Sequence, residues 1–190
     1  FPGFIETASY LPADAYDQET AHYSPHARAD HVAILCRMAG EKDLNAAGAF
    51  SSGASTLCVS NSHGLFAWHA ISEADFQTVV MSDDSSGRAQ ASSWKVVDLN
   101  PESIGREAIS KAELGRDPRQ VDPGSYPVIL DPYATEDLLD MLNLYGMGGQ
   151  AVLDGRSWMN DRFEEQAMSP GVNIWDDGHD PSCMPMPFYM

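Results

Sequence analysis

The densest group of side chains able to do chemistry lies near the end of the chain, in the stretch WDDGHDPSC at 175–183. It contains three aspartates, one histidine and one cysteine, namely Asp176, Asp177, His179, Asp180 and Cys183. Carboxylates, imidazole and thiolate all bind divalent cations. Their spacing matches neither an EF-hand loop nor a zinc ligand set, so a solvated acidic loop is the favoured interpretation. A hydrolase using Asp176, Asp177 and His179 stays open as an alternative.

Other isolated polar residues have simpler structural interpretations. His63 falls in a predicted hairpin tip and His69 lies beside Trp68 in a predicted strand, and both are interpreted as turn or surface histidines. Cys58 alternates within another strand and is predicted to be a small apolar core residue. SDDSSG at 82–87 is a turn by its composition. The sequence contains no GxSxG, P-loop or GxGxxG motif, so neither a nucleophile elbow nor a nucleotide loop is indicated.

The charge of the chain excludes one class of function. The sequence has 28 acidic and 11 basic residues, which gives a net charge of -17 at neutral pH. The acidic residues are spread over every quarter of the chain rather than gathered in a tail. Such a surface repels phosphate groups, so we expect no direct binding of nucleic acid.

The cysteines and the hydropathy pattern predict where the protein works. Cys36, Cys58 and Cys183 are odd in number and lack CxxC spacing, which favours a reducing compartment. The uncharged stretch 44–72 is interrupted by Ser, Gly and Asn, with the turn NSHG in its middle, so it predicts a hairpin rather than a membrane span. Without a secretory signal at its start, the chain is predicted to be cytoplasmic and free of the membrane.

Two helices with clear start signals flank a series of strand-like runs. Ser24 and Pro25 begin a helix that Gly40 ends, and its predicted inner face holds Val32, Leu35, Cys36 and Ala39. Asn100 and Pro101 begin a second helix that ends at Gly115, with Ile104, Ala108 and Ala112 on one face. Between them lie five runs with the composition of strands: 48–55, 56–60, 64–72, 75–82 and 89–99. Short turns between such runs favour an antiparallel meander.

The turn-rich segment 116–126 predicts a domain boundary. The expected organisation is a connector at 1–23, a middle α+β domain at 24–118, and the beginning of a truncated C-terminal domain at 125–190. PVILD at 127–131 is predicted to be a short buried strand. The fold class is therefore α+β: an antiparallel β meander with flanking helices, followed by the start of a second, β-rich domain.

A third helix is predicted to begin at Asp131 and Pro132. Its apolar residues recur at helical spacing, at positions Leu138, Met141, Leu142 and Tyr145. Met141 and Tyr145 lie four apart and are expected to share a packed face. Positions five apart on a regular helix differ by about 140° around the axis, so Asp140 and Tyr145 need not face the same point.

The order of several segments resembles the central part of the TldD/PmbA peptidase family, long described as modulators of DNA gyrase. The resemblance covers roughly residues 20–190 and rests on the succession of motifs. These are GASTLCVSNSHGLFAWH, SSGRAQASSWKVVDLNPESIGREA, PGSYPVILDPYATEDLLDMLNLYG, GRSWMNDRFEEQAMSP and NIWDDGHDPS. The resemblance implies a cytoplasmic protein with a β-rich C-terminal domain, working as a dimer that encloses a peptide-degrading chamber.

The resemblance also identifies positions where a metal site is expected in active members. Their helix after the PVIL-like strand carries His-Glu-x-x-x-His, and a much later Cys supplies a further zinc ligand. In this chain Asp140 stands at the first His, Met141 at the Glu and Tyr145 at the second His. A thioether cannot act as a general base, and a neutral phenol is a poor substitute for imidazole as a ligand. We therefore predict no catalytic residue, no zinc site and no cofactor in this chain.

The resemblance implies a non-catalytic homologue or subunit of a TldD/PmbA-type peptidase, of the PmbA kind. Its partner is expected to be a zinc-bearing TldD-like subunit or a second copy of itself, and its substrates are expected to be peptides. Whether the chain is itself an enzyme is left open. The alternative is an interaction protein that modulates another complex, of the gyrase or toxin-antitoxin kind, without proteolysis.

Overall fold

The computed structural model describes residues 10–188. The contacts divide the chain into two compact units, unit 1 with Phe1–Gln120 and Asp177–Met190, and unit 2 with Val121–Asp176. Unit 2 is thus inserted in the chain between two parts of unit 1. The domain bounds 1–23, 24–118 and 125–190 stay predictions, because contact units and sequence domains are different divisions of a chain.

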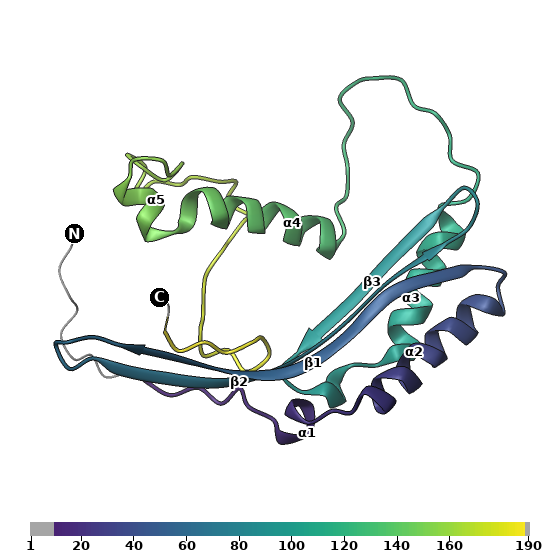
Figure 1. Ribbon diagram of the computed structural model, residues 1–190. Coiled ribbons are helices and arrows are strands. Elements are labelled where there is room, and N and C mark those ends of the chain that lie inside the picture. The colour runs from purple at the N-terminus through teal and green to yellow at the C-terminus, as the bar shows by residue number, and fades with distance from the viewer. Residues whose placement is uncertain (1–9, 189–190) are drawn as a thin grey trace. The chain divides into compact units, whose positions relative to one another are not determined.

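Unit 1 is built on a three-stranded antiparallel sheet in the order β1-β2-β3. β1 spans Asn45–Ser60, β2 spans Phe66–Met81 and β3 spans Ser86–Ser93. The predicted meander is confirmed, but its five runs form three strands. The pairing of β1 with β2 is continuous from Asn45↔Met81 to Ser60↔Phe66, so the Gly and Ser residues inside these strands do not interrupt the ladder (Figure 1).

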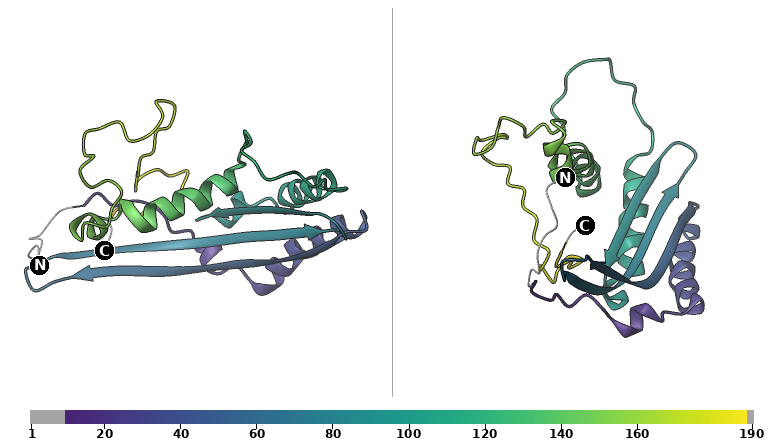
Figure 2. Two further views of the ribbon diagram at one scale, coloured as in Figure 1. Left: turned by 90° about the horizontal axis from the view of Figure 1, so that it is seen from above. Right: turned by 60° about the vertical axis from the view of Figure 1, so that its left-hand side comes forward.

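The β1–β2 hairpin extends well beyond β3 (Figure 2). β3 pairs with β2 only from Ala74↔Ser93 to Met81↔Ser86. We call the part of the hairpin beyond β3, residues 53–60 and 66–73, the distal hairpin. It consists of two strands where the rest of the sheet has three, and an isolated pair of strands is only marginally stable in water.

The helices of unit 1 begin where their caps predict. α2 spans Pro25–Gly40, and the Ser24 hydroxyl accepts a hydrogen bond from the Ala27 amide at 3.1 Å. α3 spans Pro101–Leu114, and the Asn100 side chain accepts from the Ser103 amide at 2.9 Å. These bonds satisfy amides that a helix start leaves unpaired. Both predicted helices are confirmed, and they are accompanied by the short α1 (Gln18–Ala21) and a 3₁₀ turn η1 (Val96–Asp98).

The core of unit 1 lies between α2, α3 and one face of the sheet (Figure 1). Its buried members include Leu35, Phe76, Val80, Ile104, Ala108 and Ala112. β3 approaches α3 very closely at Gly87, where an added Cβ would lie 2.1 Å from the Ala108 carbonyl oxygen. Only a residue without a side chain fits between this strand and this helix. Cys36, predicted to face the core, is exposed.

The buried face of β2 changes along the strand. In the part that pairs with β3, alternate residues from Ala74 to Val80 are buried towards the helices. In the distal hairpin, Ala67 and His69 are buried instead, on the opposite face. There the C-terminal residues of unit 1 supply the cover, since the His69 ring contacts the Pro185 carbonyl oxygen at 2.8 Å. β2 therefore buries one face where it packs on the helices and the opposite face in the distal hairpin.

The described part of the predicted connector, residues 10–23, packs against β2. Ala15 forms a parallel bridge to Ile71, and the Ser72 amide donates to the Ala15 carbonyl at 2.9 Å. The Tyr10 hydroxyl donates to the Trp68 carbonyl and accepts from its amide. This segment therefore satisfies the edge of β2 that β3 leaves unpaired. Residues 1–9 lie outside the described residues.

Unit 2 consists of helices in an extended chain. α4 spans Pro132–Leu142, a π-helical turn η2 spans Asn143–Met147, and α5 spans Gly149–Leu153. The predicted strand at 127–131 is wrong, because this segment pairs with no strand and Ile129 is fully exposed, at 100%. Residues 121–176 contain no strand, so the predicted second domain begins with helices. No helix within residues 10–188 has the length and apolar character needed to cross a membrane.

Candidate functional site

Asp140, Met141 and Tyr145 lie on α4 and on the turn that follows it. The family resemblance implies that active members carry metal-site residues at these three positions. Asp140 and Met141 are in the last turn of α4, whose start is capped by Asp131. Tyr145 lies in the π turn η2. A π turn closes its hydrogen bonds over five residues rather than four, so it advances less per residue around the axis than an α-helix. Tyr145 is therefore displaced from the position that a regular helix predicts.

The apolar face of this helix is not packed in a core. α4 buries none of its side chains, and Met141 and Tyr145 are 53% and 65% exposed. The expectation that these two residues pack together in a core is wrong for unit 2. The physical reason is that α4 is accompanied only by η2 and α5, which are too short to cover an amphipathic face.

The donor set at these positions does not fit zinc. One carboxylate, at Asp140, is the only strong ligand, since a thioether and a neutral phenol stand at the other two positions. Within residues 10–188, no three His, Cys, Asp or Glu side chains come together in a way that could hold a metal ion. We therefore derive no chemical step that uses a metal in this chain.

The loop that follows α5 packs against the π turn η2 through Ser157 and Trp158. The Ser157 hydroxyl donates to the Gly146 carbonyl oxygen, and Ser157 is buried. The Trp158 indole lies directly against Gly146, where an added Cβ would come within 2.0 Å of Cδ1. The backbone at Gly146 can therefore approach the indole only because it has no side chain. The contact of Gly146 with Ser157 and Trp158 was not predicted from the sequence, where a glycine at a helix end and a downstream Ser-Trp pair are the available signals.

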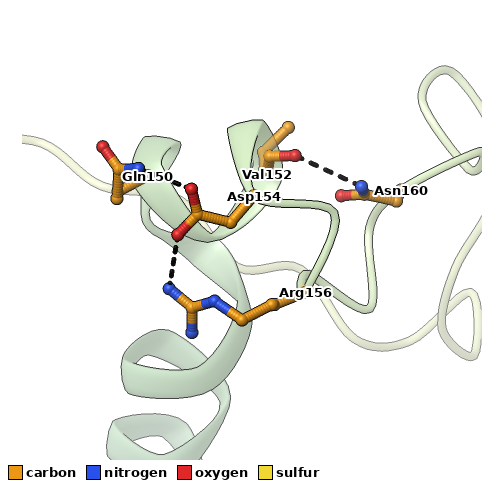
Figure 3. Close-up of polar contacts among 5 residues, drawn as sticks. All are labelled: Gln150, Val152, Asp154, Arg156 and Asn160. Carbon is orange, nitrogen blue, oxygen red and sulfur yellow. Dashed lines mark hydrogen bonds and ion pairs between the residues drawn. The ribbon is translucent and has the colours of Figure 1, made fainter.

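Polar contacts fold the loop back on α5 (Figure 3). The Asp154 carboxylate accepts from the Gln150 amide at 2.7 Å and from the Arg156 guanidinium at 2.9 Å. The hydrogen bond from Arg156, and to a smaller extent that from Gln150, lowers the pKa of Asp154 below its ordinary value. The Asn160 side chain donates to the Val152 carbonyl at 3.2 Å. The loop is thus tied at both ends to the helix that precedes it.

The acidic group at 176–183 is held in turns rather than gathered around a site. The Asp177 carboxylate accepts from the His179 amide at 3.0 Å, and the His179 ring contacts the Leu11 carbonyl oxygen at 3.0 Å. The Asp180 carboxylate accepts from the hydroxyl and the amide of Ser182, and these bonds lower the pKa of Asp180. The local bonds agree with the favoured interpretation of an acidic loop.

Three other predicted residues have clear positions. His63 lies in the hairpin tip as predicted, where the Asn61 side chain accepts from the His63 amide at 2.9 Å. His69 is not a surface residue, because it is buried and bonded to Pro185. Cys58 is not a core residue, since it is exposed and pairs across the strands with the exposed Trp68. The predicted turn at 82–87 is confirmed over its first four residues, and the Asp84 carboxylate accepts from the Asp117 amide.

Comparisons with known proteins agree with this architecture. Residues 123–188 match the family model of the PmbA/TldA metallopeptidase C-terminal domain. The crystal structure of a proposed modulator of a DNA gyrase from Thermotoga maritima matches with a TM-score of 0.74 and 20% sequence identity. The match covers 86% of this chain and 40% of that chain, and at this identity it shows the fold. No curated protein matches the chain.

The matched segment 123–188 is similar to the C-terminal domain of the PmbA/TldA metallopeptidases, and the fold is that of the solved structure. Over residues 123–188 the chain is similar to the C-terminal domain of the TldD/PmbA family. It spans about two fifths of the length of the solved structure that it matches, so the activity of a whole family member is a matter for proposal.

Proposed function

We propose that the chain is a non-catalytic homologue or subunit of a TldD/PmbA-type cytoplasmic peptidase that takes part in peptide maturation and proteolysis. The observation that carries this proposal is the identity of the residues at the metal-site positions. By the resemblance, Asp140, Met141 and Tyr145 correspond to the His, Glu and His of active members of the family. A single carboxylate with a thioether and a phenol neither retains zinc nor activates a water molecule at neutral pH.

In this proposal the catalytic metal belongs to a partner, a TldD-like subunit, and this chain supplies surface to the assembly. Two features support a role in contacts. The helix α4 and the turn η2 that follows it present exposed apolar side chains, with Leu138, Met141 and Tyr145 all more than half exposed. The chain also shares the fold of a solved structure that it matches with a TM-score of 0.74.

The metal content of the purified protein tests the proposal. The chain is incubated with zinc, dialysed, and analysed by elemental mass spectrometry. We expect far less than one zinc ion per chain and no peptide cleavage by the chain alone. One tightly held ion per chain would contradict the proposal. A matched variant carrying Asp140→His, Met141→Glu and Tyr145→His is expected to retain more zinc than the natural chain, because two imidazoles replace a carboxylate and a phenol.

A second candidate function is favoured by one observation, the similarity to a protein described as a proposed modulator of a DNA gyrase. Here the chain binds and modulates another complex, and proteolysis is irrelevant. Capture of partners from a cell extract separates the two functions. A TldD-type partner that carries the His-Glu-x-x-x-His motif, and peptide cleavage by the mixture, support the first. A partner without that motif and no cleavage support the second.

A further inference from the structure

The last described residues of unit 1, 177–188, lie against the distal hairpin, and we call this segment the strap (Figure 1). The strap contains no helix or strand. It closes on itself where the Met186 amide donates to the Gly178 carbonyl oxygen at 2.9 Å. The side chain of Pro185 is fully buried, although Pro181 at the other end of the loop is exposed. The strap is therefore a compact loop with one deeply buried residue.

The strap covers the face of β2 opposite to the one that packs on the helices. Ala67 and His69 share this face because they lie two apart in the strand, and each is only 4% exposed. The His69 ring contacts the Pro185 carbonyl oxygen and lies edge-on to the ring of Phe188, with the two centroids 6.5 Å apart. If the strap moves away, this face of the hairpin meets solvent.

Side chains rather than backbone groups attach the strap to the rest of unit 1. In addition to the His69 contact, the Trp94 indole donates to the Pro181 carbonyl oxygen at 3.2 Å. The His179 ring contacts the Leu11 carbonyl oxygen at 3.0 Å. In the described part of the chain, the backbone hydrogen bonds of the strap all stay within the strap. It can therefore leave without breaking the pairing of β1, β2 and β3.

The composition of the strap explains why it covers the sheet without joining it. Pro181, Pro185 and Pro187 have no amide hydrogen, so they cannot donate to a neighbouring strand. For the same reason the burial of a proline leaves no amide donor unpaired. Each side-chain hydrogen bond of the attachment is worth about two- to tenfold in an equilibrium constant. A segment held by a few such bonds opens at a lower free energy than the sheet beneath it.

We propose that the strap is a lid, which opens and closes over the Ala67–His69 face while the sheet and the helices α2 and α3 stay folded. In the closed state His69 is bonded to Pro185 and shielded from water. In the open state the His69 ring and the Trp94 indole present their polar groups to solvent. The lid thereby controls access to this face of the sheet. The inference goes beyond the proposed function and does not depend on whether the chain holds a metal.

The reactivity of a cysteine under the lid is the first test. Cys36, Cys58 and Cys183, which are exposed, are replaced by serine, and Ala67→Cys then places a single thiol on the covered face. We expect a thiol reagent to label it slowly, at the rate that opening of the lid allows. Because the opening exposes little surface, this rate should change little in dilute urea.

Ala74→Cys is the matched control, because it lies in the same strand and is 0% exposed in the core beneath the helices. It should react at least about a hundredfold more slowly than Ala67→Cys and depend steeply on urea, since only unfolding of the sheet exposes it. Equal rates with the same urea dependence would overturn the proposal. Labelling of Ala67→Cys as fast as in the unfolded chain would overturn it too.

A change in the attachment should change the opening. Trp94→Phe removes the indole donor to Pro181 and keeps an aromatic ring, so we expect Ala67→Cys to be labelled about two- to tenfold faster. Trp175→Phe makes the same change at a side chain that is 78% exposed in unit 2, and it should leave the rate unchanged. No increase with Trp94→Phe, or the same increase with both variants, contradicts the lid.

Chemical modification of His69 gives a readout that does not depend on the folding of a cysteine variant. Diethyl pyrocarbonate modifies accessible imidazoles, and mass spectrometry of peptides separates His69 from His63 in the exposed hairpin tip. In the natural chain we expect fast modification of His63 and slow modification of His69 without urea. Trp94→Phe should accelerate the modification of His69 alone. A His69 that reacts only at urea concentrations that unfold the sheet overturns the proposal.

Discussion

The His69 side chain in β2 contacts the carbonyl oxygen of Pro185 at 2.8 Å, although 116 residues separate them in the sequence. A second bond of the same kind joins the Trp94 indole to the Pro181 carbonyl at 3.2 Å. Both acceptors are proline carbonyls, and both donors come from the sheet region of unit 1. The C-terminal residues of unit 1 are therefore fixed to the sheet by side-chain donors at two points.

Replacement of His69 should loosen this attachment. We expect His69→Ala to lower the free energy of unfolding by about 1–3 kcal/mol, because it leaves the Pro185 carbonyl without its buried partner. His63→Ala in the exposed hairpin tip should change stability by less than about 0.5 kcal/mol. Urea unfolding of the two variants measures the difference. Equal stability of both would show that the His69 contact contributes nothing.

Gly87 should tolerate no side chain. Gly87→Ala places a Cβ at 2.1 Å from the Ala108 carbonyl and 2.6 Å from the Ala112 amide nitrogen, both backbone atoms of α3. We expect a loss of about 1–3 kcal/mol or more, since strand and helix must separate. Gly53→Ala is the control, because nothing lies within 4 Å of its added Cβ. Thermal unfolding followed by circular dichroism should show a lower midpoint for Gly87→Ala alone.

The contact of Gly146 with Trp158 can be tested by a double-mutant cycle. Gly146→Ala should destabilise unit 2, because the new methyl group overlaps the indole. Trp158→Ala alone should also destabilise it, through lost packing. The two changes together should cost less than the sum of the single changes, since removal of the indole removes the clash. Hydrogen exchange of the amides in 146–160 measures the local stability, and simple additivity would contradict the contact.

Asp17 should make stability depend on pH in acid. Its carboxylate accepts from the hydroxyl and the amide of Thr20, each at 2.7 Å, and these bonds lower the pKa of Asp17. A folded pKa below the unfolded value, about 3.9, means that the ionised group stabilises the fold above that pH. The contribution is lost as the pH falls towards the folded pKa.

The comparison of the natural chain with Asp17→Asn isolates the charge, because asparagine also caps a helix. Asp17→Asn should be less stable near neutral pH, and the difference should shrink as the pH falls below the unfolded pKa and through the lowered folded pKa of Asp17. Urea unfolding at several pH values measures it. A difference independent of pH would show that the ionised carboxylate is not the source. Asp17→Ala should cost about 0.5–2 kcal/mol near neutral pH, as the loss of a cap does.

The parts of the fold that depend on local signals could be predicted from the sequence. Ser24 with Pro25, Asn100 with Pro101, and Asp131 with Pro132 each begin a helix, because cap and proline act within one turn of chain. Alternation within β1 does not show which face of the strand is covered, so the prediction that Cys58 is a core residue was wrong.

The features that were not predicted depend on distant residues or on altered helix geometry. His69 is buried only because Pro185 and its neighbours return to the sheet, which no local pattern records. The segment 127–131 has the composition of a strand but lacks a partner strand. The positions of Asp140, Met141 and Tyr145 followed from the resemblance, whereas the π turn, Ser157 and Trp158 did not follow from a regular helical period.

Unit 1 is made of two segments of the chain, the first of which ends at Gln120 and the second of which begins at Asp177. During synthesis on the ribosome the strands and helices of unit 1 emerge early, but the residues that cover His69 emerge only after the whole of unit 2. Until then that face of the distal hairpin is open to water. The order of synthesis therefore delays the last step of folding, and a pause within 121–176 would prolong the exposure of an uncharged, aggregation-prone surface.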